Sequence, residues 1–406
     1  MHTLLPAFRS RNYRLFFTGQ LISLIGTWMQ QIAMIWLAYR LTDSAAMLGL
    51  VGFASQIPIL LFSTLAGVWT DRLDRRRLLL WTQFFSLLQA LALFALTLTG
   101  AVTPAFLVIL AFLLGCINAI DLPARQAFVA QLVEDKADLP NAIGLNSLLM
   151  NGSRFVGPTL AGLIVATAGE AACFLINALS YLGVLIALSA IRLKPRAVRS
   201  QPALTALRAG LRYAFQHPQI RSSLFLVAGF SFFVTPYTVL MPVFAREIFH
   251  GAADTYGFLI GSAGIGSLCA AVFLALRGRN GISAGLDKLV AQATFTAGIA
   301  LASFVLVATL SPVLLWAYPL LSILGFSAVL TIAGSNTLIQ TEVEEDFRGR
   351  VMAIFSTAFM GIAPLGSLVV GAIGETFGVR PTLFACGLLA LALGITNLRQ
   401  LKSSAR

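Results

Sequence analysis

Charged residues are scarce in this chain. Asp, Glu, Lys and Arg together make up 11% of its 406 residues, whereas a soluble domain carries about a quarter. Hydrophobic residues make up 58%, which is too large a share for a protein that folds in water. The composition therefore predicts a protein embedded in a lipid bilayer.

Cysteine and histidine are also few. The four cysteines lie far apart within apolar runs, and the three histidines lie outside these runs. None has the spacing of a metal site or a redox motif, so we expect structural thiols and no bound metal. Nucleotide-binding loops, nucleophile elbows and zinc-protease motifs are absent as well. We therefore expect neither an enzyme nor a bound cofactor.

Long apolar runs dominate what remains. A helix that crosses a bilayer needs about 20 mostly apolar residues. The runs that meet this condition cover residues 13–39, 47–70, 78–100, 104–124, 141–167, 171–191, 219–245, 253–276, 287–310, 312–340, 350–373 and 379–398. The first is too long for a cleavable signal peptide. The sequence thus predicts an all-α membrane protein with twelve transmembrane helices.

The basic residues are distributed unevenly between the connecting segments. With the N-terminus in the cytoplasm, only Arg40, Arg246 and Arg380 of the 28 Lys and Arg residues fall on the opposite side, and Arg154 lies within a span. This bias predicts that both termini are cytoplasmic. The net charge of +12 is thinly spread rather than gathered on one domain, so orientation in the membrane explains it better than nucleic-acid binding.

The two halves of the chain resemble each other. Ser23, Thr27 and Gln30 of the first run recur as Ser231, Thr235 and Thr238 of the seventh, and Gly115 recurs as Gly325, where Asp121 then faces Thr331. We therefore expect two six-helix bundles, residues 1–191 and 219–406, joined by a basic linker, residues 192–218. Leu204, Leu207, Leu211 and Phe215 have helical spacing, so the linker is either an amphipathic helix on the cytoplasmic surface or a solvated connection.

Polar residues inside the spans are the candidate site. Thr27 and Gln30 share one helical face, which either packs against another helix or lines a cavity. Asp121 and Arg125 are four residues apart and either form an ion pair or face a substrate. Arg154 lies deep in a span and either binds an anionic ligand or pairs with an acid such as Asp121. The candidate cavity residues are Thr27, Gln30, Asn118, Asp121, Arg125, Asn146, Arg154, Thr235 and Thr238.

Span 5 is rich in small residues. Gly144, Ser153, Gly157, Pro158 and Gly162 would permit close helix contact, and the proline would bend the helix. The charged segment 67–77 between spans 2 and 3 is a short cytoplasmic connection that fixes the orientation of both spans.

These segments resemble the major facilitator superfamily. The loop with Gly67, Asp71, Arg72, Arg75, Arg76 and Arg77 is similar to the signature loop between helices 2 and 3 of that family, with Asp74 in place of the second glycine. The resemblance implies a latch between the halves, in which Asp71 caps the start of span 11 near Arg348 and Arg350. The small residues of span 5 are similar to the family's antiporter signature, with Ser153 and Ala161 replacing two glycines.

The stretches GTWMQQIAMIWLAYRLTDSA and LPNAIGLNSLLMNGSRFVGP, together with PARQAFVAQLV and RGRVMAI, resemble the enterobactin-exporter and macrolide-efflux branch of that superfamily. The resemblance implies the major facilitator fold and an exporter in the bacterial inner membrane. It would exchange protons for a small amphipathic molecule such as a siderophore or a drug, by alternating access, probably as a monomer in lipid. Import of a small metabolite and lipid flipping on the same fold are alternatives, and a membrane scaffold or receptor that transports nothing is an alternative from another class.

Overall fold

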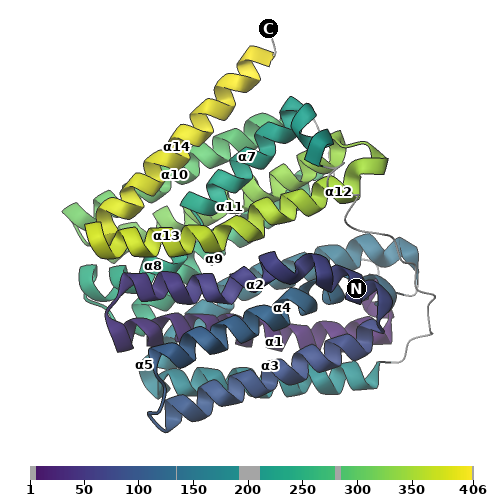
Figure 1. Cartoon of the computed structure of the whole chain (residues 1–406), viewed down its shortest axis with the longest axis horizontal. Helices are drawn as coiled ribbons and strands as arrows, with labels where there is room; N and C mark the ends of the chain where they lie inside the picture. The colour runs from purple at the N-terminus through teal and green to yellow at the C-terminus, as the bar shows by residue number, and fades with distance from the viewer. Residues whose placement is uncertain (1–5, 134, 192–210, 279–284, 405–406) are drawn as a thin grey trace.

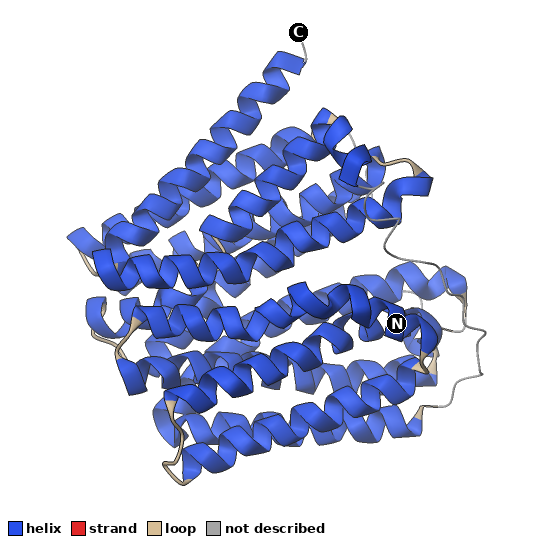
Figure 2. Cartoon of the chain, viewed as in Figure 1, coloured by secondary structure: helices blue, strands red, loops and turns tan. Residues whose placement is uncertain are grey.

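The computed structural model describes residues 6–133, 135–191, 211–278 and 285–404, without the side chains of 63–72, 136, 346 and 402–404. All regular elements in these residues are helical, and no strand is found among them (Figure 2). The first half contains η1 (Pro6–Arg9), α1 (Arg11–Thr42), α2 (Ala45–Arg72), α3 (Arg75–Leu98), α4 (Pro104–Leu132), η2 (Lys136–Asp138) and α5 (Leu139–Ala190). The second half contains α7 (Pro218–Phe233), α8 (Tyr237–Val243), η3 (Phe244–Ile248), α9 (Ala253–Gly278), α10 (Leu286–Leu310), α11 (Leu314–Glu342), α12 (Glu345–Ser356), η4 (Thr357–Gly361), α13 (Ile362–Phe377) and α14 (Val379–Ser404).

Eleven helical segments of the described residues are long and apolar enough to cross a membrane. One of them, α5, has 52 residues and would measure about 78 Å if straight, more than twice the hydrocarbon thickness of about 30 Å. At Gly169 its backbone adopts φ 81° and ψ 171°, angles that glycine reaches far more easily than other residues. The chain turns there, so α5 supplies two crossings, and the prediction of twelve spans is confirmed.

The helices form two blocks that lie side by side. Figure 1 shows α1 to α5 in one block and α7 to α14 in the other. The blocks touch chiefly along two helix pairs, α5 with α9 and α2 with α13. Between them lies one large apolar core that includes residues of both blocks, such as Trp36, Leu48, Phe244 and Tyr256.

Glycines make both contacts between the blocks very close. A Cβ on Gly371 would lie 2.7 Å from the Cα of Gly49, and a Cβ on Gly162 would lie 2.9 Å from the Cα of Gly257. Any larger residue would push these helices apart. The two crossings are related by the repeat, since Gly257 follows Gly49 by 208 positions and Gly371 follows Gly162 by 209.

The repeat also holds within each block. A Cβ on Gly115 of α4 would lie 2.7 Å from the carbonyl oxygen of Ser55 in α2. A Cβ on Gly325 of α11 would lie 1.9 Å from the carbonyl oxygen of Ala263 in α9. Gly115 and Gly325, paired in the sequence, thus occupy equivalent helix crossings, and the two bundles are pseudo-symmetric.

Two spans that the sequence predicts as single helices are interrupted. The run 219–245 is split into α7 and α8 by a turn at residues 234–236, because Pro236 cannot donate a helical hydrogen bond and disfavours helical angles at the preceding Thr235. The run 350–373 is split by the π-helical turn η4. By contrast, α5 passes through Pro158 with helical backbone angles, and its one departure is Gly169.

The linker between the blocks lies largely outside the described residues. Residues 192–210, which include Leu204 and Leu207, are among those not described. Residues 211–216 are helical, and Leu211 and Phe215 are both exposed. The domain boundaries and the amphipathic helix therefore stay predictions.

Candidate functional site

A buried carboxylate lies inside the first block, on α4. Asp121 is 2% exposed. Its Oδ1 accepts hydrogen bonds from Thr82 Oγ1 at 2.7 Å and from the Gln83 amide at 2.9 Å, both on α3. Its Oδ2 forms an ion pair with the guanidinium of Arg125, one turn along α4. The charge is thus compensated on both oxygens, as burial of a carboxylate requires.

The arginine of this pair reaches a third helix. Arg125 Nη1 donates to Gln20 Oε1 of α1 at 3.3 Å. We refer to Asp121, Arg125, Thr82, Gln83 and Gln20 as the α4 charge cluster. Within the described residues, Arg125 Nε and Gln83 Oε1 are buried without a partner. The cluster therefore retains one unused donor and one unused acceptor, so its hydrogen bonds have room to rearrange.

Side-chain amides form a second group in the first block. Gln30, which is fully buried, donates to Gln89 Oε1 of α3 at 2.8 Å and accepts from the Asn177 amide of α5 at 2.8 Å. Gln89 in turn donates to the carbonyl oxygen of Leu110 in α4 at 3.1 Å. We refer to Gln30, Gln89 and Asn177 as the amide network. It joins α1, α3, α4 and α5, and its contacts are those of the helix-packing alternative for Gln30.

The other candidates of the first block differ in their contacts. Thr27 Oγ1 donates to the carbonyl oxygen of Ser23 at 2.8 Å and lies 3.3 Å from the Tyr181 hydroxyl. Asn118 and Asn146 are half-buried, and the structure gives their side chains no hydrogen bond to a described residue. The polar face of α1 therefore turns into the first block, while the two asparagines keep free hydrogen-bonding groups.

Hydroxyl groups take the equivalent positions in the second block. Thr331 on α11 and Thr294 on α10 are fully buried, and their hydroxyl oxygens are 3.2 Å apart. Ser335, one turn after Thr331, is also fully buried, and its hydroxyl has no partner in the described part of the chain. The repeat thus aligns Thr331 with Asp121 and Ser335 with Arg125.

Thr235 and Thr238 lie at the break between α7 and α8. Both are half-buried. Thr238 Oγ1 donates to the carbonyl oxygen of Thr235 at 3.2 Å, whereas the Thr235 hydroxyl has no hydrogen bond to a described residue. Broken helices near the interface of two repeats are common features of transporter binding sites.

Arg154 lies half-way along the first arm of α5. It is half-buried, and its guanidinium lies over the Trp28 ring, 5.4 Å from the ring centroid. Among the side chains that the structure describes, no carboxylate pairs with Arg154, and Asp121 pairs with Arg125 instead. The ion pair between Arg154 and Asp121 that the sequence left open is therefore not formed.

One end of the contact between the blocks carries polar bonds. Tyr39 donates to Glu247, and Arg246 pairs with Asp43. We refer to these residues, with Glu375 and its partners, as the outer seam: Glu375 Oε2 accepts from the Ser44 hydroxyl and the Ala46 backbone amide, both at 3.1 Å. In the described residues, every side-chain hydrogen bond between the blocks lies in this seam.

The signature loop is described in part. Nothing is described of the side chains of Gly67, Asp71 and Arg72, so the predicted cap of Asp71 on span 11 lies outside the described residues. Arg75 donates to the carbonyl oxygen of Ala127 at 3.3 Å, and Arg76 donates to those of Leu188 and Ser189 at 2.7 and 2.6 Å.

The backbone amide of Arg77 is capped by Asp74 Oδ1 at 2.8 Å. Arg348 is exposed, and Arg350 lies over the Phe347 ring at 5.2 Å. The described contacts of the loop therefore stay within the first block, and a cation at the carboxyl end of α5 is favourable there.

The small residues of α5 serve different contacts. Gly144 is exposed and nothing packs on it, Ser153 bonds back to the carbonyl oxygen of Leu149, and Pro158 is buried. Gly157 lies against Trp28 of the same block, whereas Gly162 lies against α9 of the other. The signature thus packs α5 on both blocks at once.

Cavities in the described structure do not coincide with the predicted site. One of about 840 Å³ opens between α7, α10, α11 and α14 of the second block, beside Arg221, Asp287 and Glu342. Another of about 190 Å³ lies beside Trp36, Tyr39, Arg40 and Arg246 at the outer seam. Among the described residues no cluster of side chains could hold a metal ion.

Several partners of the site escaped the sequence analysis. Thr82, Gln89 and their neighbour Ser86 on α3 have the same helical spacing as the polar face of α1, so the same rule would have found them. Nothing in the sequence indicated that Trp28 lies under Arg154. The partners in the outer seam, such as Asp43 and Arg246, come from different blocks and follow only from the arrangement of the repeats.

Comparisons with known proteins point to one family. The family model described as transmembrane secretion effector matches residues 2–405. The staphyloferrin A transporter of Staphylococcus aureus is 28% identical over 389 residues, 93% of each chain. The multidrug efflux pump Tap of Mycolicibacterium fortuitum is 25% identical over 90% of this chain and 89% of its own. The macrolide efflux protein A of Streptococcus pyogenes is 23% identical over 93% of each.

Solved structures share the fold at low identity. A bacterial homologue of the lysosomal transporter Spinster, in an inward-facing and unoccupied conformation, matches with a TM-score of 0.74 and 15% identity over 96% of this chain and 97% of its own. A bacterial homologue of the iron transporter ferroportin, in an inward-facing state, matches with a TM-score of 0.71 and 16% identity over 95% and 98%. The architecture is therefore that of the major facilitator transporters.

Proposed function

This chain belongs to the transmembrane secretion effector family of the major facilitator superfamily, and on that premise we propose that it exports a small amphipathic molecule, such as a siderophore or a drug, in exchange for protons. The relatives named above, a siderophore transporter and two efflux proteins, support export of such a cargo. We place the chain in a bacterial inner membrane with both termini in the cytoplasm, on the basis of the distribution of Lys and Arg.

The mechanism we propose is alternating access by two rigid halves, residues 1–191 and 219–406. Its support is the outer seam, which closes one end of the interface, while no bond between the blocks is formed at the opposite end by the described residues. With the basic side in the cytoplasm, the seam faces outward, and the cargo enters from within. The close Gly162–Gly257 and Gly49–Gly371 crossings would act as the contacts about which the halves tilt.

The proton would be carried by the α4 charge cluster. Asp121 is a buried carboxylate inside a span, and a titratable group there is a strong candidate for a proton relay. A proton on Asp121 cancels its attraction to Arg125, whose guanidinium then needs another partner. The unused Arg125 Nε and Gln83 Oε1 allow the hydrogen bonds to rearrange, so that protonation is coupled to the position of α4 against α1 and α3.

Asn118, Asn146, Thr235 and Arg154 are the cavity residues that we retain. Their side chains form no hydrogen bond with a described residue, so they have donors and acceptors to offer a cargo. Gln30 and Thr27 are satisfied within the first block, and we assign them to packing. Thr238 is likewise bonded to its own helix.

Transport in inside-out membrane vesicles tests the proposal. Vesicles that contain the chain and are acidified inside should accumulate a radiolabelled macrolide or ethidium, and a protonophore should abolish this accumulation. Accumulation in whole cells rather than in vesicles would indicate an importer. Altered lipid distribution between leaflets would indicate a flippase, and no movement of any probe by reconstituted protein would indicate a scaffold.

A further inference from the structure

An unpaired cation at the interface of the two blocks requires an explanation. Arg154 is fifteen residues from each end of its arm of α5, which begins at Leu139 and ends at Gly169, so it lies near the middle of the span. It is half-buried and has neither an ion pair nor a hydrogen bond among the described side chains. A charge at this depth is costly unless it meets a partner or water. The other intramembrane arginine, Arg125, has such a partner in Asp121.

The surroundings of Arg154 leave its hydrogen-bond donors free. Its guanidinium lies over the Trp28 ring, and stacking uses the face of the group rather than its N–H donors, which point outward in its plane. The packing of Gly157 against Trp28, where a Cβ would lie 2.4 Å from the Trp28 Cβ, holds the ring in place. The site therefore presents an aromatic wall and a planar fork of donors.

The second block approaches the same place. A Cβ on Gly264 of α9 would lie 2.7 Å from the carbonyl oxygen of Arg154. The side chain of Tyr237, next to the α7–α8 break, is near enough to interact electrostatically with the guanidinium. Tyr256 on α9 is fully buried, and its hydroxyl has no partner in the described part of the chain. The subsite thus lies where both blocks meet, and it contains further donors but no described acid.

We propose that Arg154 and Trp28 form an anion subsite, and that the exported cargo is an organic carboxylate with an apolar body. A carboxylate can accept two parallel hydrogen bonds from a guanidinium, and its apolar body would lie along the Trp28 ring. A neutral compound would leave the charge unsatisfied. The assignment of this anion as cargo rests on the proposed export function, whereas the binding of the anion does not.

Calorimetric titration of the full chain in phosphatidylcholine nanodiscs tests the subsite at neutral pH. The probes are 2-naphthoate and 2-naphthamide, which share an aromatic body and differ in charge. We expect the carboxylate to bind tighter by about tenfold or more. Arg154→Gln should abolish this preference, and Arg154→Lys should restore part of it. Trp28→Leu should weaken both probes. Arg14→Gln, at an exposed arginine of α1, is the matched control and should change neither.

Equal binding of the two probes by the wild type would overturn the subsite, as would a preference that survives Arg154→Gln in protein of unchanged melting temperature. An anionic lipid phosphate shares the required chemistry, so the titration is repeated in phosphatidylglycerol nanodiscs. Loss of naphthoate binding there alone would assign the subsite to lipid and overturn the cargo. Naphthoate binding without transport in vesicles would contradict the exporter but not the subsite, and transport of ethidium without any carboxylate preference would do the reverse.

Discussion

The interiors of the two halves use equivalent helix positions with different chemistry. In the first half, Thr82 on α3 donates to Asp121 on α4, and Asp121 pairs with Arg125. In the second half, Thr294 on α10 meets Thr331 on α11, and the repeat places Ser335 where Arg125 would be. The same helix crossing is thus charged in one half and carries only hydroxyls in the other.

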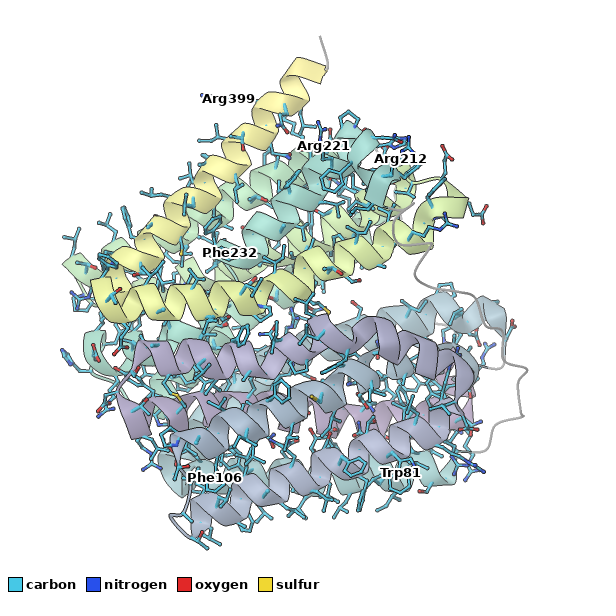
Figure 3. The ribbon with its side chains drawn as sticks, viewed as in Figure 1. Trp81, Phe106, Arg212, Arg221, Phe232 and Arg399 are labelled. Atoms are coloured by element: carbon cyan, nitrogen blue, oxygen red, sulfur yellow. The ribbon has the colours of Figure 1, made fainter. Side chains whose placement is uncertain are left out.

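This difference indicates a division of labour between halves of one fold. Hydroxyl groups bond across helices in lipid and do not titrate, so the second half can act as a rigid counterpart. An ion pair is costly to bury and is not needed to hold the crossing together, since Thr294 and Thr331 hold the equivalent one without it. The charge in the first half is therefore better explained by a function than by packing. The side-chain positions in Figure 3 show how densely both blocks are packed around these crossings.

The largest effect should come from neutralising the carboxylate of the first half. Asp121→Asn leaves Arg125 buried without a countercharge, which should destabilise the protein by about 3–5 kcal/mol. Transport driven by the pH gradient should fall to the level of empty vesicles. Thermal unfolding in nanodiscs and transport of ethidium measure the two effects.

A double variant separates coupling from folding. Asp121→Asn with Arg125→Gln removes both charges, so it should recover most of the lost stability without recovering transport. Full transport by the double variant would show that the pair is structural. The paired variant Thr331→Val in the second half should keep transport coupled to protons.

Introducing the charge into the second half should have the next largest effect. Thr331→Asp buries a carboxylate beside Ser335, which cannot neutralise it, and should lower the melting temperature markedly. Adding Ser335→Arg should restore part of the loss, because it recreates the Asp121–Arg125 pair on α11. If Thr331→Asp is as stable as the wild type, the second half already tolerates a charge and the comparison is wrong.

The amide network should show a moderate difference between halves. Asn177→Leu removes a donor to the fully buried Gln30, whose Oε1 then lacks its partner, at a cost of about 1–3 kcal/mol. Thr238→Val, at the position that the repeat matches to Gln30, should cost less because Thr238 bonds only to its own helix. Thermal unfolding of both variants side by side measures this, and equal losses would contradict the assignment of Gln30 to packing.

The smallest effect on stability should come from the outer seam, which both halves share. Arg246 and Asp43 are 45% and 65% exposed at their side chains, so Arg246→Ala should cost only about 0.2–1 kcal/mol. It should nevertheless raise the labelling rate of a cysteine placed at the seam, because it weakens the closed end. Arg380→Ala, an exchange at the same end outside the described seam bonds, is the control.

The sequence predicted the spans, the repeat and the intramembrane charges, because these follow from hydropathy and spacing. Gly115 and Gly325 illustrate this, since an offset in the sequence corresponds to equivalent crossings in the fold. Spacing also shows that Gln30 shares a face with Thr27, but it cannot show which neighbouring helix that face meets. The partners Gln89 and Asn177, the ring under Arg154 and the turn at Gly169 depend on packing between distant segments, and they required the structure.

The tilting of the two halves is tested most directly by distances between spin labels. One pair, at Leu73 and Arg348, spans the basic end, and another, at Leu98 and Leu310, spans the opposite end; all four residues are exposed. With the native cysteines replaced, double electron–electron resonance is recorded at acidic and alkaline pH. The account predicts that one distance shortens as the other lengthens, and that Asp121→Asn removes this response. Distances that change in the same direction at both ends, or that change equally in Asp121→Asn, would contradict it.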